Sequence, residues 1–293
     1  MPNVPSRVFA RRLEAPSRLV VEPIVRQALL EDVGRGGDLT TDAIVASDVR
    51  ARAAVVARKP GVVAGTDAAL LAFTLLDERA EIEIRISDGE PVAAGETIAV
   101  VSGDAHAVLT GERTALNLLT HLCGVATATR RLVDLVAGTK ARIADTRKTT
   151  PGLRALEKYA VRCGGGVNHR FGLDDAVLVK DNHLALSGSI RAAVAAVRAH
   201  AGHMVKVEVE VDTLEQLREA LDERIDAVLL DNMNPEQLAA AVAMVGGRVV
   251  TEASGGVTSE TVVAIARSGV DLISVGALTL GAPVLDIGLD IAT

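Results

Sequence analysis

The sequence predicts an α/β protein: an incomplete α/β barrel of about six βα units, preceded by a smaller N-terminal α+β domain. Beyond residue 139, short runs rich in β-branched residues alternate with amphipathic segments of helical periodicity, which is typical of parallel strands joined by helices. Six such units are fewer than the eight of a complete barrel, and no glycine-rich dinucleotide fingerprint follows the first run. We therefore favour an incomplete or modified barrel over the alternative, an open doubly wound sheet.

Residues 1–20 are expected to form an N-terminal extension. They carry four arginines and a single acidic residue, Glu14, and they lack the apolar stretch of a secretory signal. A frayed extension explains this composition better than the alternative, a transit peptide.

The smaller domain is predicted over residues 21–112, because helical and alternating patterns mix there without a βα rhythm. The run GRGG ends a helical pattern, and DGEPVAAGETIAVVSG has the glycines and the proline of a turn and a hairpin. The expected elements are helices at 22–33 and 67–76, strands at 50–58 and 81–87, and the turn and hairpin at 88–103.

The barrel domain is predicted over residues 113–293, and its last residues could pack back on the smaller domain. A long helical stretch at 105–138, which we divide into more than one helix, leads into it. The six predicted strands are in KARIADT, AVLVKDN, MVKVEVEV, AVLLDN, RVVTEASGG and LISVGALT. The helices between them are in LRALEKYAVRC, SIRAAVAAVRAH, TLEQLREALDE, PEQLAAAVAMV and SETVVAIARS.

Composition narrows the possible functions. Apolar residues make up 49% of the chain and aromatic residues 1%, so the core is aliphatic and a nucleic-acid surface of stacked aromatic side chains is not expected. The net charge of −7 argues against a general polyanion binder. Cys123 and Cys163 lack metal-ligand spacing and are expected in the core of a protein in a reducing cytosol. No apolar run is long enough to span a bilayer, so we expect a cytoplasmic protein with neither a membrane nor a nucleic-acid partner.

Charged residues interrupt four of the predicted strands near their carboxyl ends. A strand buried on both faces should be apolar, and a buried charge costs stability unless it is paired or faces a polar cavity. The four residues are Lys148, Lys180, Glu210 and Asp231. Because the carboxyl ends of parallel strands meet on one rim of a barrel, these residues predict a site on that rim.

The residue types around this rim predict a ligand with carboxylates, a sugar and phosphates. Arginine suits carboxylates and lysine suits phosphate, whereas Glu210 and Asp231 suit ribose hydroxyls or Mg²⁺. The small residues SGG at 254–256 and VGA at 275–277 would expose backbone N–H groups at helix starts, as a phosphate cradle. The predicted cationic residues are Arg147, Lys148, His169, Arg170 and Lys180.

Some neighbouring residues have a structural explanation as well as a functional one. The glycine run 164–166 either ends the preceding helix or forms a ligand loop. His183 is interpreted as structural. Glu208 lies on the same side of its predicted strand as Glu210, so periodicity does not separate their roles.

The segment DTRKTTPGLRALEKYAVRCGGGVNHRFGLDDAVLVKDNH, at 145–183, closely resembles the signature region of the quinolinate phosphoribosyltransferases, also called nicotinate-nucleotide pyrophosphorylases (carboxylating). The similarity continues in order through EDVGRGGDLTTDAIV, KPGVVAGTDAALL, LTGERTALNLLTHLCGVAT, VEVEVDTLEQL, LLDN, EASGGVTSET and SVGALT. It covers nearly the whole chain apart from the N-terminal extension.

This resemblance implies a type II phosphoribosyltransferase fold, assembled as a homodimer. It also implies an activity in NAD biosynthesis: quinolinate and phosphoribosyl pyrophosphate give nicotinate mononucleotide, CO₂ and pyrophosphate, with Mg²⁺. By similarity, quinolinate would contact Arg147, His169, Arg170 and Lys180, with Arg113 reaching in from the partner subunit.

The resemblance also implies how the rest of the site is used. The phosphoribosyl group and its phosphates would be bound by Lys148, Glu210, Asp231, Ser254, Gly255, Gly256, Val275, Gly276 and Ala277. Thr146 is a further expected substrate-binding residue. The implied catalytic residues are Lys148, Lys180, Glu210 and Asp231. Mg²⁺ is expected at Glu210 and Asp231, either directly or through substrate and water.

Two other functions are compatible with the same pattern. One is a phosphoribosyltransferase for a monocarboxylate such as nicotinate or for another acceptor, and the other is a non-catalytic module that binds a phosphorylated metabolite. A monocarboxylate would need fewer cations, and carboxylates such as Glu210 and Asp231 would weaken simple phosphate capture. Both therefore rank behind quinolinate phosphoribosyl transfer.

Overall fold

The computed structural model describes residues 13–291, which form two compact units. The first unit contains the chain up to Thr120 and the residues from Asp286 onward, and the second contains His121–Leu285. Among the described residues, no helix combines the length and the apolar character needed to cross a membrane. The cytoplasmic location stays a prediction.

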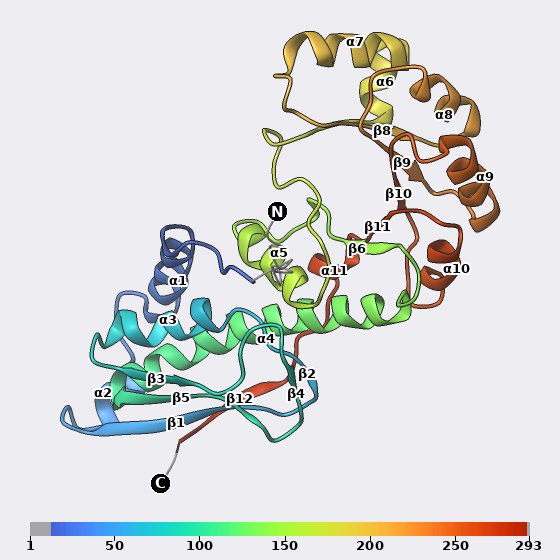
Figure 1. Ribbon diagram of the computed structural model, residues 1–293. Helices are drawn as coiled ribbons and strands as arrows, with labels where there is room; N and C mark the ends of the chain where they lie inside the picture. Colours follow the sequence, from blue (N-terminus) through green and yellow to red (C-terminus); the bar gives the residue numbers. More distant parts are fainter. Residues whose placement is uncertain (1–12, 292–293) are drawn as a thin grey trace, which may run out of the picture. The chain divides into compact units, whose positions relative to one another are not determined.

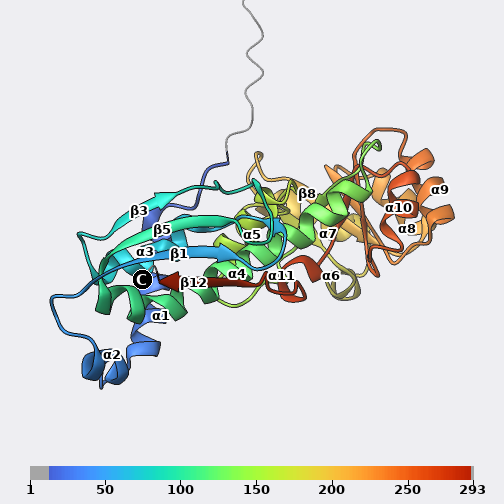
Figure 2. The same cartoon turned by 90° about the horizontal axis from the view of Figure 1, so that it is seen from below.

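The first unit contains a four-stranded antiparallel sheet in the order β12-β1-β5-β3. Its strands are β1 (Arg50–Ala57), β3 (Glu81–Ile84), β5 (Thr97–Asp104) and β12 (Ile287–Ile291). Helices α1 (Arg18–Val33), α2 (Leu39–Ile44) and α3 (Thr66–Leu76) belong to the same unit. The views in Figures 1 and 2 both show β12, from the end of the chain, lying beside β1.

The start of one helix and the pairing of one strand in this unit differ from the sequence prediction. Helix α1 begins at Arg18 and not at residue 22, because the hydroxyl of Ser17 accepts the backbone N–H of Leu19 and caps the helix. The predicted hairpin at 88–103 is wrong: β4 (Pro91–Val92) pairs with β2 (Gly61–Val62), whereas β5 lies between β1 and β3. Periodicity identified the extended segments, but it carries no information about which strands pair.

Helix α4 (Ala105–Leu135) is continuous over 31 residues, so the prediction of more than one helix is wrong. The helix contains two glycines, Gly111 and Gly124, and at each of them another segment packs closely against the helix. A Cβ on Gly111 would lie 2.9 Å from Phe73 Cδ1, and one on Gly124 would overlap the backbone oxygen of Pro283. Glycine inside a helix costs about 1 kcal/mol relative to alanine, and these contacts explain why it is tolerated.

The second unit contains a six-stranded parallel sheet in the order β6-β11-β10-β9-β8-β7 (Figure 1). Its strands are β6 (Arg142–Ala144), β7 (Val177–Val179), β8 (Val207–Val211), β9 (Ala227–Asp231), β10 (Val250–Ser254) and β11 (Leu272–Ser274). The order follows the chain from β7 to β11, and the first strand lies beside the last. A doubly wound sheet would reverse its order in the middle, so the barrel is confirmed and the alternative is excluded.

The barrel is incomplete between β6 and β7. Within residues 13–291 these strands do not pair, and Val167 instead makes an isolated bridge to Ala144 beside β6. The chain between them contains α5 (Arg154–Cys163) and the loop that carries His169 and Arg170. A complete barrel of eight strands would have two more strands in this gap. Here the gap contains the cationic loop instead.

Helices α7–α10 lie on the outside of the strands that they connect (Figure 1). Their bounds are α7 (Ile190–His200), α8 (Leu214–Leu221), α9 (Pro235–Val245) and α10 (Val262–Arg267); the short α6 (Asp181–Ser187) and α11 (Ala277–Leu280) follow β7 and β11. Ser189, Thr213 and Asn234 cap α7, α8 and α9 through their side chains. The core is aliphatic as predicted, and Cys123 and Cys163 are buried in it without a disulfide.

Candidate active site

A cavity of about 420 Å³ lies at the carboxyl ends of the parallel strands. Its polar lining is Thr146, Arg147, Lys148, His169, Arg170, Lys180, Glu210, Asp231, Glu252, Ser254 and Ser274, with Leu178 and Leu229 between them. All of these residues belong to the second unit. The four charged residues singled out from the strand ends therefore do meet at one place.

The strand register explains why these side chains converge. Leu229 in the middle of β9 is paired with Glu210 on β8 and with Glu252 on β10, and Asp231 is paired with Ser254. Alternate residues of a strand face the same side, so each strand presents one residue near its end and another two positions earlier. The cavity thus has an outer layer that includes Asp231 and Ser254, and a deeper layer at Glu252.

The cationic side of the cavity is not neutralised by the protein. In the described part of the chain, none of Arg147, Lys148, Arg170 and Lys180 takes part in an ion pair. The Nε of Arg147 is buried without a hydrogen-bond partner. Burial, followed by the charge of Arg147, lowers the pKa of Arg170. Holding several positive charges close together in a partly buried place costs free energy. Such an arrangement indicates a site for an anionic ligand.

The acidic side of the cavity consists of Glu210 and Asp231, which are half-buried and likewise form no ion pair among the described residues. Burial and then the charge of Asp231 raise the pKa of Glu210. Burial and then the charge of Asp212 raise the pKa of Asp231. Two carboxylates that disfavour each other's charge form a site for a cation or for developing positive charge.

A buried cluster beneath the cavity holds the cationic loop in place. The amine of Lys158 on α5 bonds to Asp145 and to the carbonyl oxygen of His169, and Asp145 also accepts the backbone N–H of His169 at 2.9 Å. Asn168 donates to Asp145 as well. Sequence reasoning missed Asp145 and Lys158; their buried charges are satisfied by one another and by the loop.

The glycine run is structural. Gly164 follows the last residue of α5, and its backbone N–H bonds to Ala160, so the run ends the helix. A Cβ on Gly164 would lie 2.5 Å from Cβ of Thr129, and one on Gly166 would lie 2.7 Å from Cγ1 of Val161. The glycines allow the loop to pass close to α4, which sets the starting point of the segment that carries His169.

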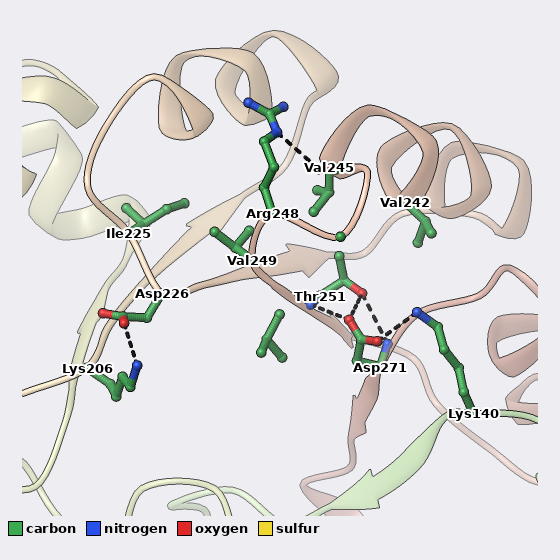
Figure 3. Close-up of a pocket in the computed structure, with 12 residues that line it drawn as sticks. Lys140, Lys206, Ile225, Asp226, Val242, Val245, Arg248, Val249, Thr251 and Asp271 are labelled. Carbon is green, nitrogen blue, oxygen red and sulfur yellow. Dashed lines mark hydrogen bonds and ion pairs between the residues drawn. The ribbon is translucent and has the colours of Figure 1, made fainter.

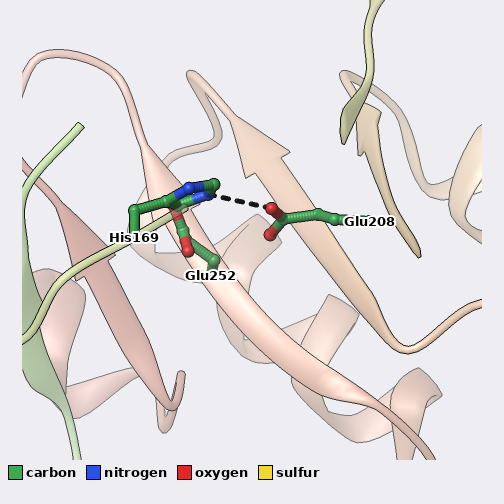
Figure 4. Close-up of side chains that lie close together, drawn as sticks. All are labelled: His169, Glu208 and Glu252. Atoms are coloured by element: carbon green, nitrogen blue, oxygen red, sulfur yellow. Dashed lines mark hydrogen bonds and ion pairs between the residues drawn. The ribbon is translucent and has the colours of Figure 1, made fainter. Parts of the chain in front are cut away.

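His169 faces two acidic residues and bonds to one of them, Glu208 (Figure 4). Its Nε2 lies 2.9 Å from Oε2 of Glu208 and 3.6 Å from Oε1 of Glu252. Its Nδ1 accepts the backbone N–H of Arg170 at 2.7 Å. The structure thus separates Glu208, which faces the histidine, from Glu210, which lines the cavity. Glu252 was not recognised from the sequence, although it lies two residues before Ser254 inside an apolar run and therefore on the same face.

The ligand atoms of His169, Glu208 and Glu252 lie within 4.8 Å of one another, so these three side chains have the composition and spacing of a metal-ligand set. Glu210 and Asp231 offer further oxygen ligands in the lining of the cavity. Carboxylate oxygens are the ligands that Mg²⁺ prefers, whereas a histidine nitrogen favours transition metals.

The small residues after the last two strands differ in their surroundings. Gly255 has a φ of +94° and leaves room for the side chain of Asn232, and Gly276 leaves room for Lys148. The expected helix start at SGG is wrong, because α10 begins only at Val262. At VGA, helix α11 does begin directly, at Ala277. Of these six positions, Ser254 lines the cavity.

Two further predicted residues lie outside the cavity lining. The Nδ1 of His183 accepts the backbone N–H of Lys180 at 2.9 Å, which confirms a structural role at the start of α6. Arg113 is an exposed residue of α4 in the first unit, and no ion pair with Glu112 or another acid is found for it in the described residues.

A second cavity, of about 440 Å³, lies at the opposite, amino-terminal ends of the strands (Figure 3). Its lysines are paired: Lys140 Nζ lies 2.7 Å from Asp271 and Lys206 Nζ lies 2.7 Å from Asp226. Arg248 donates to backbone carbonyls of α9. The charges at this end of the barrel are thus satisfied within the protein, as is typical of interactions that stabilise a fold.

The fold and the cavity define an α/β-barrel protein with a cavity lined by cations and carboxylates at the carboxyl ends of its strands. Comparison with known proteins identifies the family. Residues 38–123 match the model of the quinolinate phosphoribosyl transferase N-terminal domain, and residues 125–290 match that of the C-terminal domain. The chain therefore belongs to the quinolinate phosphoribosyl transferase family.

Individual relatives are similar over almost their whole length. The nicotinate-nucleotide pyrophosphorylase (carboxylating) of Mycobacterium leprae is 48% identical over 91% of this chain and 95% of its own. A probable enzyme of the same name from Bacillus subtilis is 44% identical over 94% of each chain. The solved nicotinate-nucleotide pyrophosphorylase of Francisella tularensis has a TM-score of 0.90 at 39% identity, covering 96% of this chain and 99% of that one.

Proposed function

We propose that the protein transfers the phosphoribosyl group of phosphoribosyl pyrophosphate to quinolinate and releases CO₂ and pyrophosphate, which gives nicotinate mononucleotide for NAD biosynthesis. The observation that carries the proposal is the cavity, in which four cations that form no ion pair within residues 13–291 lie beside two half-buried carboxylates. The cations match a dicarboxylate and a pyrophosphate, and the carboxylates match a ribose. The names of the relatives support the same activity.

The acceptor is assigned to the side of the cavity with Arg147, His169, Arg170 and Lys180. Arginine forks bind carboxylates in a fixed orientation, which would direct the ring nitrogen toward the sugar. The donor is assigned to Thr146 and Lys148, to the acids Glu210 and Asp231, and to the small residues that follow β10 and β11.

The first chemical step joins the ring nitrogen of quinolinate to the anomeric carbon as pyrophosphate leaves. Positive charge develops on the ribose, and Glu210 and Asp231 are placed to stabilise it. Lys148 and Lys180 neutralise the leaving group. The ribosylated ring nitrogen is cationic, so the ring itself accepts the electron pair when the adjacent carboxylate leaves as CO₂; a proton then takes its place on the carbon. Much of the catalysis is positioning and electrostatics.

The residues present fit Mg²⁺ as a cofactor. Glu210 and Asp231 are oxygen ligands with raised pKa values and without a cation partner in the described protein. They would hold the ion directly or through substrate and water, and the ion would supply charge neutralisation at the phosphates.

The protein is further proposed to act as a homodimer in which Arg113 of each chain completes the neighbouring site. Arg113 is exposed and has no ion-pair partner in the described residues, which suits a ligand-binding role. The same unit exposes large apolar side chains on α1 and α2, at Leu19, Leu30, Leu39 and Ile44. Such a surface is suited to association between copies of the chain.

The test is an assay with quinolinate, phosphoribosyl pyrophosphate and Mg²⁺, in which labelled CO₂ and nicotinate mononucleotide are both measured. We expect the two products in equal amounts. A parallel reaction with nicotinate distinguishes the monocarboxylate alternative: nicotinate mononucleotide formed from nicotinate at a comparable rate, with none from quinolinate, would contradict the proposal. Binding of the donor without turnover of either acceptor would favour a non-catalytic binding module.

A further inference from the structure

Helix α5 lies between two loops that both supply side chains to the cavity. We call residues 145–153, between β6 and α5, the leading loop, and residues 164–176, between α5 and β7, the following loop. A side chain in the cavity acts well only if its loop holds it in a fixed place, so the contacts of α5 with these loops bear on the chemistry. The leading loop supplies Thr146, Arg147 and Lys148, and the following loop supplies His169 and Arg170.

Two buried side chains of α5 fix one point in each loop. Glu157 is 0% exposed, and its carboxylate accepts the backbone N–H of Thr150 in the leading loop at 3.1 Å. The other oxygen of Glu157 lies 2.7 Å from Nε2 of His121 on α4, which holds the carboxylate in turn. Lys158 is 3% exposed and donates to the carbonyl oxygen of His169 in the following loop at 3.0 Å. Both loops are therefore anchored to the same turn of the helix.

Arg154, one turn earlier on the same face of α5, joins the two loops to each other. Its Nε donates to the hydroxyl of Thr149 at 3.0 Å, and its Nη1 donates to the carbonyl oxygen of Phe171 at 3.2 Å. Thr149 directly follows Lys148 in the chain. Phe171 directly follows Arg170, so the guanidinium connects the immediate neighbours of one cavity cation in each loop.

The turn that contains Phe171 is braced by its own hydrogen bonds. The carboxylate of Asp175 accepts the backbone N–H groups of Phe171 at 2.6 Å and of Gly172 at 2.9 Å. Nη1 of Arg170 donates to the carbonyl oxygen of Ala176 at 2.9 Å. A displacement of Phe171 would therefore be passed on to Arg170, and the bond from α5 fixes the position of both.

Arg154 itself is half-buried, does not line the cavity and forms no ion pair within residues 13–291. A partly buried guanidinium needs acceptors for its N–H groups, and it finds them in both loops. Its planar fork holds two acceptors in a fixed arrangement, which the single ammonium of a lysine does not. The bridge between the loops thus explains why this position is an arginine.

We propose that Arg154 is a positioning residue for phosphoribosyl transfer, which keeps the leading loop and the following loop in register so that donor and acceptor are aligned. The proposal rests on the proposed function for the identity of both substrates. Arg154 acts through Thr149, beside the donor side of the cavity, and through Phe171, beside the acceptor side. Loops that are fixed before binding need less ordering when the substrates bind, and they hold the reacting atoms closer to the geometry of the transition state.

Loss of the bridge should reduce kcat more than the affinity for one substrate alone. Each loop keeps its anchor through Glu157 or Lys158, so quinolinate alone should bind within about threefold of its wild-type affinity. The bond-forming step needs both loops in register, and a misplacement of about 1 Å can cost up to about a hundredfold. We expect Arg154→Lys, which keeps the charge but not the fork, to lower kcat by about tenfold or more.

The experiment is steady-state kinetics with quinolinate, phosphoribosyl pyrophosphate and Mg²⁺, together with titration of quinolinate alone and the free energy of unfolding. Arg218→Lys, at an exposed position of α8, is the matched control and should behave as wild type. Wild-type kcat in Arg154→Lys would mean that the charge alone is needed, which overturns the bridge. A lower free energy of unfolding with unchanged kcat would assign Arg154 a merely structural role and overturns the proposal as well.

A second set of variants keeps Arg154 and covers the case in which Arg154→Lys does not fold. Thr149→Val removes the hydroxyl that accepts Nε of Arg154, so kcat should fall, and Thr149→Ser, which keeps the hydroxyl, should restore most of it. The double variant Thr149→Val/Arg154→Lys should lie within about twofold of Arg154→Lys, because both changes break one bridge. Losses that multiply independently would show that Arg154 does not act through Thr149 and overturn the proposal.

Amide hydrogen exchange tests the bridge without any substrate. Exchange in the segments 146–150 and 169–176 should be faster in Arg154→Lys than in wild type, whereas exchange in α8 and α9 should not change. Unchanged exchange in both loops overturns the proposal. If the wild type does not turn over quinolinate, the proposed function is wrong, and this failure is distinguishable because the exchange measurement still decides whether the bridge exists.

Discussion

The side chain of Lys148 packs directly against the backbone of Gly276. A Cβ on Gly276 would lie 2.7 Å from Lys148 Cδ. The φ of Gly276 is −68°, a value that any residue adopts, so the glycine provides space and not conformational freedom. We expect Gly276→Ala to displace Lys148 and to lower kcat/KM by about tenfold or more, because a misplacement of about 1 Å can cost that much. Steady-state kinetics and the free energy of unfolding should be measured together.

Gly202→Ala is the control for this prediction, because a Cβ there meets nothing within 4 Å. It should leave both activity and stability unchanged. Wild-type kinetics in Gly276→Ala would show that Lys148 can move without consequence, and its assignment to the donor side would be wrong.

Arg147 and Arg170 should discriminate between the two substrates. Replacement of either by alanine removes a charge-assisted carboxylate contact, and quinolinate binding should weaken by about 1.5–3 kcal/mol. Binding of phosphoribosyl pyrophosphate should barely change. Titration of each ligand alone checks this, with Arg218→Ala on the exposed side of α8 as control. Equal weakening of both ligands would contradict the division of the cavity.

Glu210 and Asp231 should matter more for turnover than for acceptor binding. Glu210→Gln and Asp231→Asn keep the size of the side chain and remove the charge, which is needed most when the ribose becomes cationic. We expect a large fall in kcat with little change in quinolinate affinity. Near-normal turnover in both variants would assign these residues a structural role.

Arg113 should act across a subunit interface. An Arg113→Ala chain and a Lys180→Ala chain, each nearly inactive alone, should form mixed dimers with one site that keeps both wild-type residues. With equal amounts and random exchange, half of the dimers are mixed and each has one intact site, so activity should recover to about a quarter of wild type. If exchange is verified and no activity returns, Arg113 does not act in the neighbouring site.

Asp226, at the amino-terminal end of the barrel, should make stability depend on pH. Burial alone would raise its pKa, but hydrogen bonds from Lys206, Arg198 and the backbone lower it to about 2. A pKa below the unfolded value of about 3.9 means that the stabilisation is present above about pH 4 and is lost as the pH falls toward 2. Asp226→Asn should cost about 1–2 kcal/mol at pH 7 and progressively less below pH 4.

Denaturant unfolding of wild type and Asp226→Asn between pH 2 and 7 tests this dependence. Asp222→Asn, at an exposed position after α8, should show no comparable difference. If the difference in unfolding free energy between wild type and Asp226→Asn stays constant from pH 7 to pH 2, Asp226 is not the origin of the pH dependence.

The order of elements in the barrel could be predicted because its signals are local. Each strand is a short β-branched run and each helix an amphipathic one, so their alternation is visible within windows of a few residues. The charges at Lys148, Lys180, Glu210 and Asp231 were informative for the same reason: each interrupts an apolar run at its carboxyl end. The resemblance of the segment 145–183 to a known family added the activity, which periodicity alone does not contain.

The sequence by itself thus determined the fold class, the strand ends at which the cavity lies and the signs of the charges that line it. Only the tertiary structure decided that β4 does not pair with β5, that α4 is continuous, and that Glu208 faces His169 while Glu210 faces the cavity. It also revealed Glu252, which lies 3.6 Å from Nε2 of His169 in the loop after α5. The physical reason is that these roles depend on distances between segments far apart in the chain, which are set by strand register and packing and not by local propensity.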